Sequence, residues 1–184
     1  MAIRNTPEAY GSVSKAFHWL IFIGFIALYA IGFYMTSLPL GPEMFEKIVL
    51  HKSIGIVVLG LVVLRLLWRF FNPAPVLPDH MPPIERLGAH VSHIALYSIM
   101  IVMPLSGWAM SSAANFPISV FGWFTLPSLM SPSKPAVEFL KEFHEVMAWV
   151  ILFLLAIHVA AALKHHFINK DNVLKRILPF HKGE

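Results

Sequence analysis

The sequence predicts an all-α membrane protein, a four-helix transmembrane bundle with both termini in the cytoplasm. The chain is 57% apolar and only 13% charged, whereas soluble domains carry about 25% charged residues. Its apolar residues gather in runs of about twenty, the length needed to cross a hydrocarbon core of roughly 30 Å. Basic residues flank these runs rather than interrupting them.

Four runs are long enough to span a bilayer, and we place them at residues 16–36, 48–71, 87–110 and 143–164. They leave no room for a separate soluble unit, so residues 1–184 are expected to form a single domain. The first run is too long for a signal peptide and lacks a small-residue cleavage site. It is therefore expected to remain as the first helix of the bundle.

The connections between the runs are rich in proline. The loop between the second and third runs, residues 72–86, holds five prolines and cannot be helical throughout. The third run contains Pro104, which a helix within a bundle tolerates. The long loop 111–142 includes the aromatic stretch FPISVFGWFTLPSLM. We interpret this stretch as an interfacial segment, with a lid over a cofactor or quinone as the alternative.

The distribution of charge predicts the orientation in the membrane. An even number of spans puts both termini on one side, and that side carries ten of the fourteen Lys and Arg residues. The positive-inside rule assigns it to the cytoplasm. The basic C-terminal tail then fits lipid headgroups, and no nucleic-acid partner is expected.

The absence of cysteine limits the metal chemistry that the chain can support. It excludes iron–sulfur clusters, thiolate-ligated haem and covalent haem attachment through a C-x-x-C-H motif. The ten histidines, many for a chain this apolar, become the candidate ligands.

Two histidines of the last run share one helix face. His144 and His158 are fourteen residues apart, which returns a helical side chain to within roughly 40° and about 21 Å further along the axis. A helix face with one imidazole near each leaflet is typical of a scaffold for two haems stacked across a bilayer. In such a scaffold, paired imidazoles on facing helices clamp each iron.

Depth within the spans suggests the pairs. His51 and His144 are the histidines at the outer ends of their spans, so an outer pair must consist of these two. At the inner side, the shared face favours His158 as one ligand and His18 as its partner. His90 or His93 is the alternative partner for His158.

Other polar residues lie near these depths. His165 continues the histidine face to the inner interface, where it is placed to contact a quinone carbonyl or a haem propionate. Arg65 lies at the inner level, and Lys52 adjoins His51. We interpret both as possible propionate contacts, with snorkelling toward the interface as the alternative for Arg65.

Four segments carry a resemblance to a known family: SKAFHWL, LHKSIGI, AHVSHIALY and FHEVMAWVILFLLAIHVAAALKHHFINKDN. Together with the ordered histidines, they resemble the bacterial cytochrome b561 family over nearly the whole chain. The resemblance implies a bacterial inner-membrane bundle with two b-type haems. It also implies that His18 pairs with His158 and that His51 pairs with His144.

The resemblance also implies electron transfer across the inner membrane, between the ubiquinone pool and a periplasmic donor or acceptor. One type in the family is a superoxide:ubiquinone oxidoreductase with a quinone near the inner end of the fourth span, where His165 stands. A haem-bearing anchor of a larger redox complex is an alternative. A transporter that uses a histidine relay is a further alternative from another class.

Overall fold

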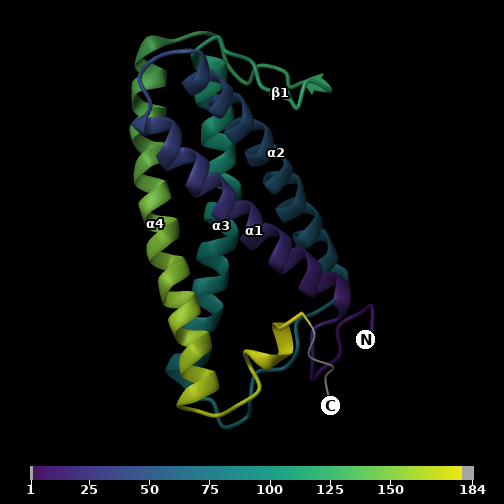
Figure 1. Ribbon diagram of the computed structural model, residues 1–184. Coiled ribbons are helices and arrows are strands. Elements are labelled where there is room, and N and C mark those ends of the chain that lie inside the picture. Colours follow the sequence, from purple (N-terminus) through teal and green to yellow (C-terminus); the bar gives the residue numbers. More distant parts are fainter. Residues whose placement is uncertain (1, 180–184) are drawn as a thin grey trace.

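The computed structural model describes residues 2–179, and within them four long helices form the bundle (Figure 1). Each helix is long and apolar enough to cross a membrane, which confirms the predicted fold class. The helices are α1 (Ser12–Ser37), α2 (Pro42–Phe71), α3 (Pro83–Ala113) and α4 (Lys134–Phe167). Both ends of the described chain lie at the same end of the bundle, here called the terminal end; the opposite end is the far end.

Each predicted span lies inside a helix, but the helices begin earlier than the apolar runs. Three of them start with a proline in the first turn, where the missing N–H costs no hydrogen bond. The largest difference is in α4, where Ser133 caps the helix by accepting a hydrogen bond from the Ala136 amide. Its first turns are polar and extend past the apolar run, so hydropathy alone could not detect them.

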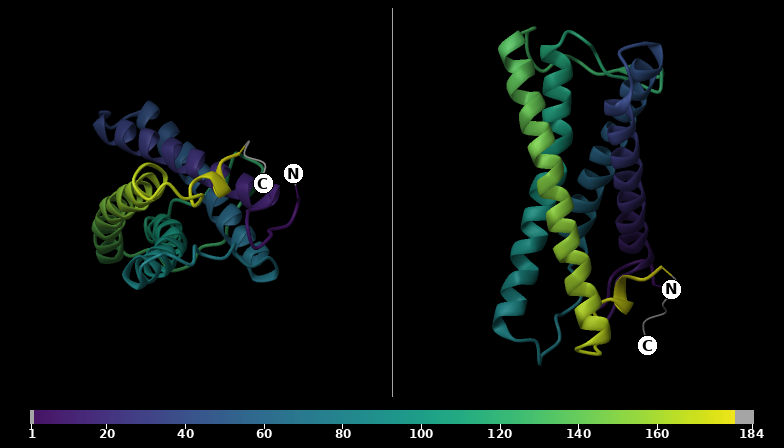
Figure 2. Two further views of the ribbon diagram at one scale, coloured as in Figure 1. Left: turned by 90° about the horizontal axis from the view of Figure 1, so that it is seen from below. Right: turned by 60° about the vertical axis from the view of Figure 1, so that its left-hand side comes forward.

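The helices pack as two neighbouring pairs, α1 with α2 and α3 with α4, and α2 also contacts α3 (Figure 2). The buried core joins α1, α2 and α3 through Ile21, Val58, Val62 and Met100. A Cβ at Gly24 would lie 2.6 Å from a methyl of Val58, so this glycine permits the close approach of α1 to α2.

One hydrogen bond links the two helix pairs directly. The Tyr29 hydroxyl on α1 donates to the Ala148 carbonyl on α4 at 2.6 Å. The large side chains of α4 point mostly outward, since Phe139, Trp149 and Phe153 are 66%, 59% and 66% exposed. An apolar exterior over polar internal contacts is what a lipid environment stabilises.

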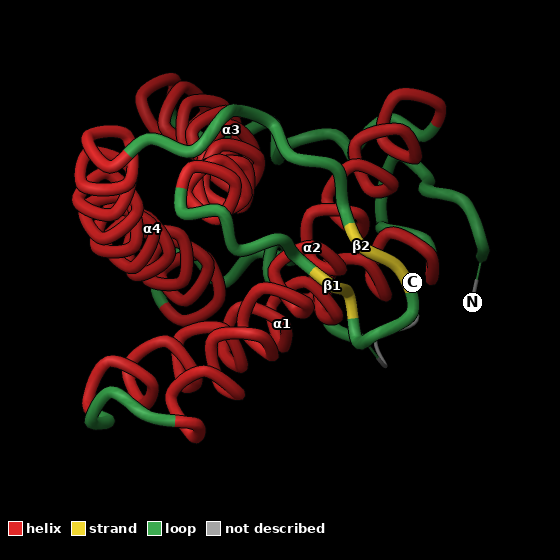
Figure 3. The backbone as a smooth tube through the Cα atoms, turned by 90° about the horizontal axis from the view of Figure 1, so that it is seen from above, coloured by secondary structure: helices red, strands yellow, loops and turns green. Residues whose placement is uncertain are grey.

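The long loop at the far end forms a small hairpin of β1 (Ser119–Val120) and β2 (Phe124–Thr125), which pair antiparallel with Ser119 opposite Thr125. Viewed from above, the hairpin lies over α2 (Figure 3). The Ser53 hydroxyl contacts it by accepting from the Phe121 amide at 3.2 Å, and its one proton lies within reach of both the Ser119 carbonyl at 3.1 Å and the Val49 carbonyl at 3.0 Å. These contacts attach the hairpin to α2.

Both terminal segments fold against the terminal end. The Asn5 side chain bonds the backbone of Asn72 and Pro73 and accepts hydrogen bonds from Gly11 and Ser14. The C-terminal segment turns back after α4 into the short 3₁₀ helix η1 (Lys175–Ile177). These segments close the region in which the predicted inner histidines lie.

Candidate functional site

The far-end pair, His51 on α2 and His144 on α4, brings together two residues that lie far apart in the sequence. Their ring centroids are 6.4 Å apart, with the planes at 70°. A metal bound between two imidazoles lies about 2 Å from each nitrogen, and each centroid lies roughly 1 Å behind its nitrogen, so such rings are about 6 Å apart. The far-end pair has the spacing of a bis-imidazole metal site.

Hydrogen bonding sets the orientation of the His144 ring. Nδ1 of His144 lies 2.9 Å from the Ser106 hydroxyl, so the opposite nitrogen, Nε2, is left to act as a ligand. In His51, Nδ1 is buried and meets no hydrogen-bond criterion within residues 2–179, and the Leu28 carbonyl is the polar group beside the ring. The two rings of this pair thus have different surroundings.

A glycine on a facing helix lies beside each ring of the far-end pair. A Cβ at Gly32 would lie 3.5 Å from Cε1 of His51, and a Cβ at Gly107 would lie 3.2 Å from Cε1 of His144. The first distance is ordinary contact, whereas the second would force the ring to shift. Gly107 therefore allows the His144 ring to rest against the backbone of α3.

The terminal-end pair, His18 on α1 and His158 on α4, has the same spacing. Its ring centroids are also 6.4 Å apart, with the planes at 46°. His93 on α3 is a second neighbour of His158, with centroids 5.6 Å apart. His90 is exposed and does not line the cavity, so of the two alternatives left open by the sequence His93 is the one whose ring contacts His158.

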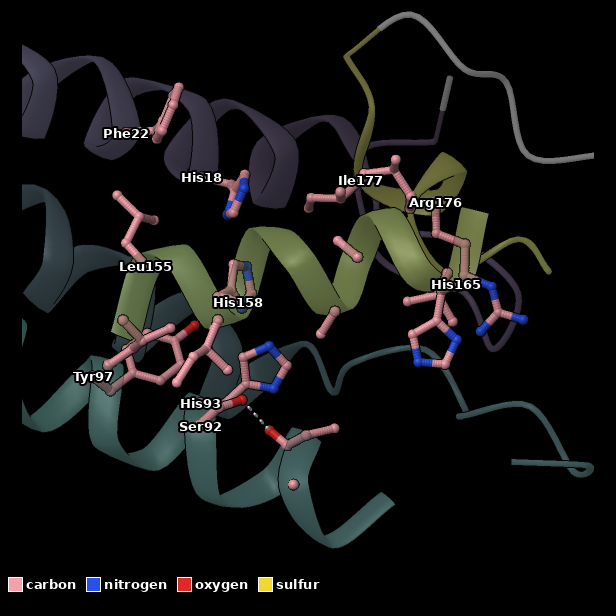
Figure 4. A pocket seen from close by; sticks show the side chains of 18 of the residues that line it. His18, Phe22, Ser92, His93, Tyr97, Leu155, His158, His165, Arg176 and Ile177 are labelled. Carbon is pink, nitrogen blue, oxygen red and sulfur yellow. Dashed lines mark hydrogen bonds between the residues drawn. The ribbon is translucent and has the colours of Figure 1, made fainter. Parts of the chain in front are cut away.

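These three histidines line a cavity of about 390 Å³ between the two helix pairs (Figure 4). The volume lies within the usual range for sites of small molecules and cofactors, about 300–1,000 Å³. Its charged lining is mainly basic and comes from α2, α4 and η1, with one carboxylate from α3: Arg65, Arg69, Lys164, Arg176 and Glu85.

Two of these basic groups stack over one aromatic ring. The guanidinium carbons of Arg65 and Arg69 lie 5.4 and 5.5 Å from the centroid of Tyr97. Stacking holds both cations beside the cavity instead of letting them extend to the interface. Burial also raises the pKa of the Tyr10 hydroxyl, which lines the cavity in its neutral form. The cavity thus combines paired imidazoles with groups suited to carboxylates.

His165 is buried at the end of α4 and also lines the cavity. Its Nδ1 lies 2.6 Å from a carboxylate oxygen of Asp171, and its Nε2 lies 3.8 Å from Glu85. Glu85 in turn pairs with Lys164 at 2.5 Å. The imidazole is therefore held between two carboxylates at the terminal end, below the terminal-end pair.

Lys52 contacts the far-end loop. Its ammonium lies 3.5 Å above the ring of Phe116 and donates to the Phe116 carbonyl at 3.2 Å. The contact attaches the far-end loop to α2. A propionate contact by Lys52 would require its ammonium to leave Phe116.

Sequence reasoning did not identify four residues that shape these sites: Ser106, Glu85, Asp171 and Arg176. Asp171 follows the end of α4, so helical spacing from His165 says nothing about it. Ser106 contacts a residue on another helix, and the relative rotation of two helices is not encoded in either one alone. No motif signal would have revealed them.

Among residues 2–179 there is no group of three or more His, Asp or Glu side chains arranged to hold a metal ion. The imidazoles meet at two levels instead, as a pair at the far end and as a group of three at the terminal end. A bundle of apolar helices with paired imidazoles between them defines the class: a multi-pass membrane protein with bis-imidazole geometry inside its bundle.

The chain belongs to the prokaryotic cytochrome b561 family, whose model matches residues 9–180. It is 41% identical over 179 residues to cytochrome b561 homolog 2 of Escherichia coli (strain K12), covering 97% of this chain and 95% of that protein. Cytochrome b561 homolog 1 of the same organism is 31% identical over 168 residues, 90% and 94% of the two chains.

A protein of Yersinia pestis named probable superoxide oxidase CybB is 29% identical over 177 residues, 96% of this chain and 99% of that protein. Family membership makes the chain a transmembrane electron-transfer protein with b-type haem. Facing imidazole side chains and a chain without cysteine are consistent with haem of this type.

Proposed function

We propose that the chain holds two b-type haems, one between His51 and His144 and one between His18 and His158. The observation that carries this proposal is the equal 6.4 Å separation of the ring centroids in both pairs. Each haem would supply a one-electron carrier whose iron has no open ligand position, which suits electron transfer rather than oxygen binding.

We infer that the protein carries electrons across the bacterial inner membrane between the ubiquinone pool and a periplasmic donor or acceptor. Residues 1–184 act as one domain, and both termini are cytoplasmic. The excess of basic residues at the terminal end supports this orientation. A reporter fused to the C-terminus, active only in the cytoplasm, tests it.

The basic side chains around the cavity fit the two carboxylates of a haem. Arg65, held beside Tyr97, is proposed as a propionate contact at the terminal end. His165 is proposed as a contact for a quinone carbonyl, because its buried imidazole lines the cavity at the terminal end of α4. Arg–carboxylate pairs are among the stronger polar contacts in proteins.

Superoxide oxidation coupled to ubiquinone reduction is the second candidate function. It is supported by the relative named as a probable superoxide oxidase, which aligns with nearly all of this chain. A role as the haem-bearing subunit of a larger redox complex differs from these two functions, since it requires a protein partner.

A transporter that uses a histidine relay needs no haem. Haem in the purified chain would therefore exclude this alternative.

The test is the haem content of the purified full chain, with reduced-minus-oxidised spectra. We expect about two b-type haems per chain, and replacement of His51 or His144 should remove one while the other remains. Retention of both haems in these variants would refute the far-end site. The rates at which superoxide and ubiquinol reduce the haems then decide between the two candidate functions. Faster reduction by superoxide supports superoxide oxidation.

A further inference from the structure

Ser106 is a buried hydroxyl that contacts a proposed haem ligand without being a ligand itself. It lies on α3 and is 6% exposed. Its Oγ is 2.7 Å from the Met103 carbonyl and 2.9 Å from Nδ1 of His144. Both partners are within hydrogen-bond distance at the same time, so the direction of each bond can be worked out.

A serine hydroxyl has one proton to donate and two lone pairs that accept. The Met103 carbonyl can only accept, so the hydroxyl proton lies on that bond. In the contact with His144, Nδ1 is then the donor, and the Met103 carbonyl is a second acceptor beside the same ring. The neutral imidazole consequently carries its proton on Nδ1, and Nε2 presents a free lone pair.

Gly107, the residue after Ser106, also limits the position of the His144 ring, because the ring lies close to its backbone. A Cβ at Gly107 would lie 3.2 Å from Cε1 of His144, so the ring rests against the backbone of α3 there. Ser106 and Gly107 are adjacent in the sequence, and together they hold one nitrogen and one edge of the imidazole. His51 has no side-chain partner of this kind: its Nδ1 meets no hydrogen-bond criterion in the described part of the chain, and the polar group beside its ring is the Leu28 carbonyl.

We propose that Ser106 is a positioning residue that fixes the tautomer and orientation of His144 and thereby sets the reduction potential of the far-end haem. This inference rests on the proposed bis-histidine site. A ligating imidazole that donates its second N–H is more basic, and such outer contacts commonly change metal affinity or activity by about 10–100-fold. A more basic ligand stabilises ferric iron, so the hydrogen bond lowers the potential.

The experiment compares Ser106→Val with Ser106→Thr in the purified full chain, because the two substitutions have the same shape and differ by a hydroxyl. Redox titration measures the midpoint potential of each haem, and electron paramagnetic resonance measures the ligand field of each ferric haem. We expect Ser106→Val to raise the far-end potential and to shift that haem's signal. Ser106→Thr should remain close to the unmodified protein, and the other haem should not change in either variant.

Ser98→Ala is the matched control, since Ser98 lies on the same helix but is exposed. It should change neither potential. His18→Ala should remove the terminal-end haem, so the signal that remains belongs to the far-end haem. The two Ser106 substitutions are therefore also measured in the His18→Ala variant. If Ser106→Val and Ser106→Thr give the same midpoint potential and the same resonance signal for the far-end haem, the proposed role of Ser106 is overturned.

Failure of this inference is distinguishable from failure of the proposed function. If the unmodified chain binds two haems and loses one in His144→Ala, the bis-histidine site stands whatever Ser106 does. If that variant keeps both haems, the site itself is wrong. If Ser106→Val does not accumulate, Gly107→Ala provides a second measurement, because its methyl group should displace the His144 ring and change the far-end signal alone.

Discussion

The indole Nε1 of Trp19 donates a hydrogen bond of 2.9 Å to the backbone carbonyl of Ile177, a residue 158 positions later in the chain. This bond attaches η1 to α1, and Arg176 and Ile177 of that segment line the same cavity as His18 and His158 (Figure 4). Arg176, next to Ile177, donates in turn to the Val76 carbonyl. The C-terminal segment thus covers the cavity from the terminal end.

Trp19→Phe should weaken this cover, because it removes the N–H while keeping an aromatic ring. The loss of one hydrogen bond costs about 1 kcal/mol, so we expect the terminal-end haem to be released several-fold faster to an external haem acceptor. Trp149→Phe is the control, since Trp149 is 59% exposed on α4. Equal release rates in the two variants would contradict this role of the C-terminal segment.

Haem content should separate the two possible partners of His158. His18→Ala is expected to remove about half of the bound haem, because a bis-imidazole site needs both ligands. His93→Ala should retain both haems, although its ring lies nearer to His158 than that of His18 does. The opposite pattern, with haem lost only in His93→Ala, would transfer the ligand assignment to His93.

Asp171→Asn should affect the His165 region without affecting haem content. It replaces a charged acceptor at 2.6 Å, and hydrogen bonds to charged groups contribute about 1.5–3 kcal/mol. We expect a lower midpoint temperature and slower oxidation of the reduced protein by ubiquinone. Asp79→Asn, at an exposed position of the proline-rich loop, is the control. Unchanged quinone kinetics would argue against a quinone at His165.

Gly24→Ala should destabilise the contact between α1 and α2. The new Cβ would lie 2.6 Å from a methyl of Val58, which is 1% exposed, and overpacking of this kind costs about 1–3 kcal/mol. Gly60→Ala makes the same change on α2, where nothing lies within 4 Å of the new Cβ. Because alanine has the better helix propensity, this variant should stabilise the protein by up to about 1 kcal/mol. Thermal unfolding in detergent measures both, and a stable Gly24→Ala variant would contradict the packing described.

The helix content and the far-end histidine pair were predictable from the sequence. The membrane sets the length of an apolar run, and the helical repeat sets which residues share a face, so both are readable within a single segment. His51 and His144 could be paired by elimination, because no other histidine occurs at that depth. The polar first turns of α4 escaped prediction, since hydropathy does not mark helix that extends beyond the membrane.

The number of apolar helices and the depth of each histidine therefore follow from the order of residues along the chain. The tertiary structure alone decided which side chains meet across helices: His93 beside His158, Ser106 beside His144, and Lys52 with Phe116. These contacts depend on the rotation and tilt of whole helices and on the path of loops. Those are set by packing among distant residues, and no local spacing records them.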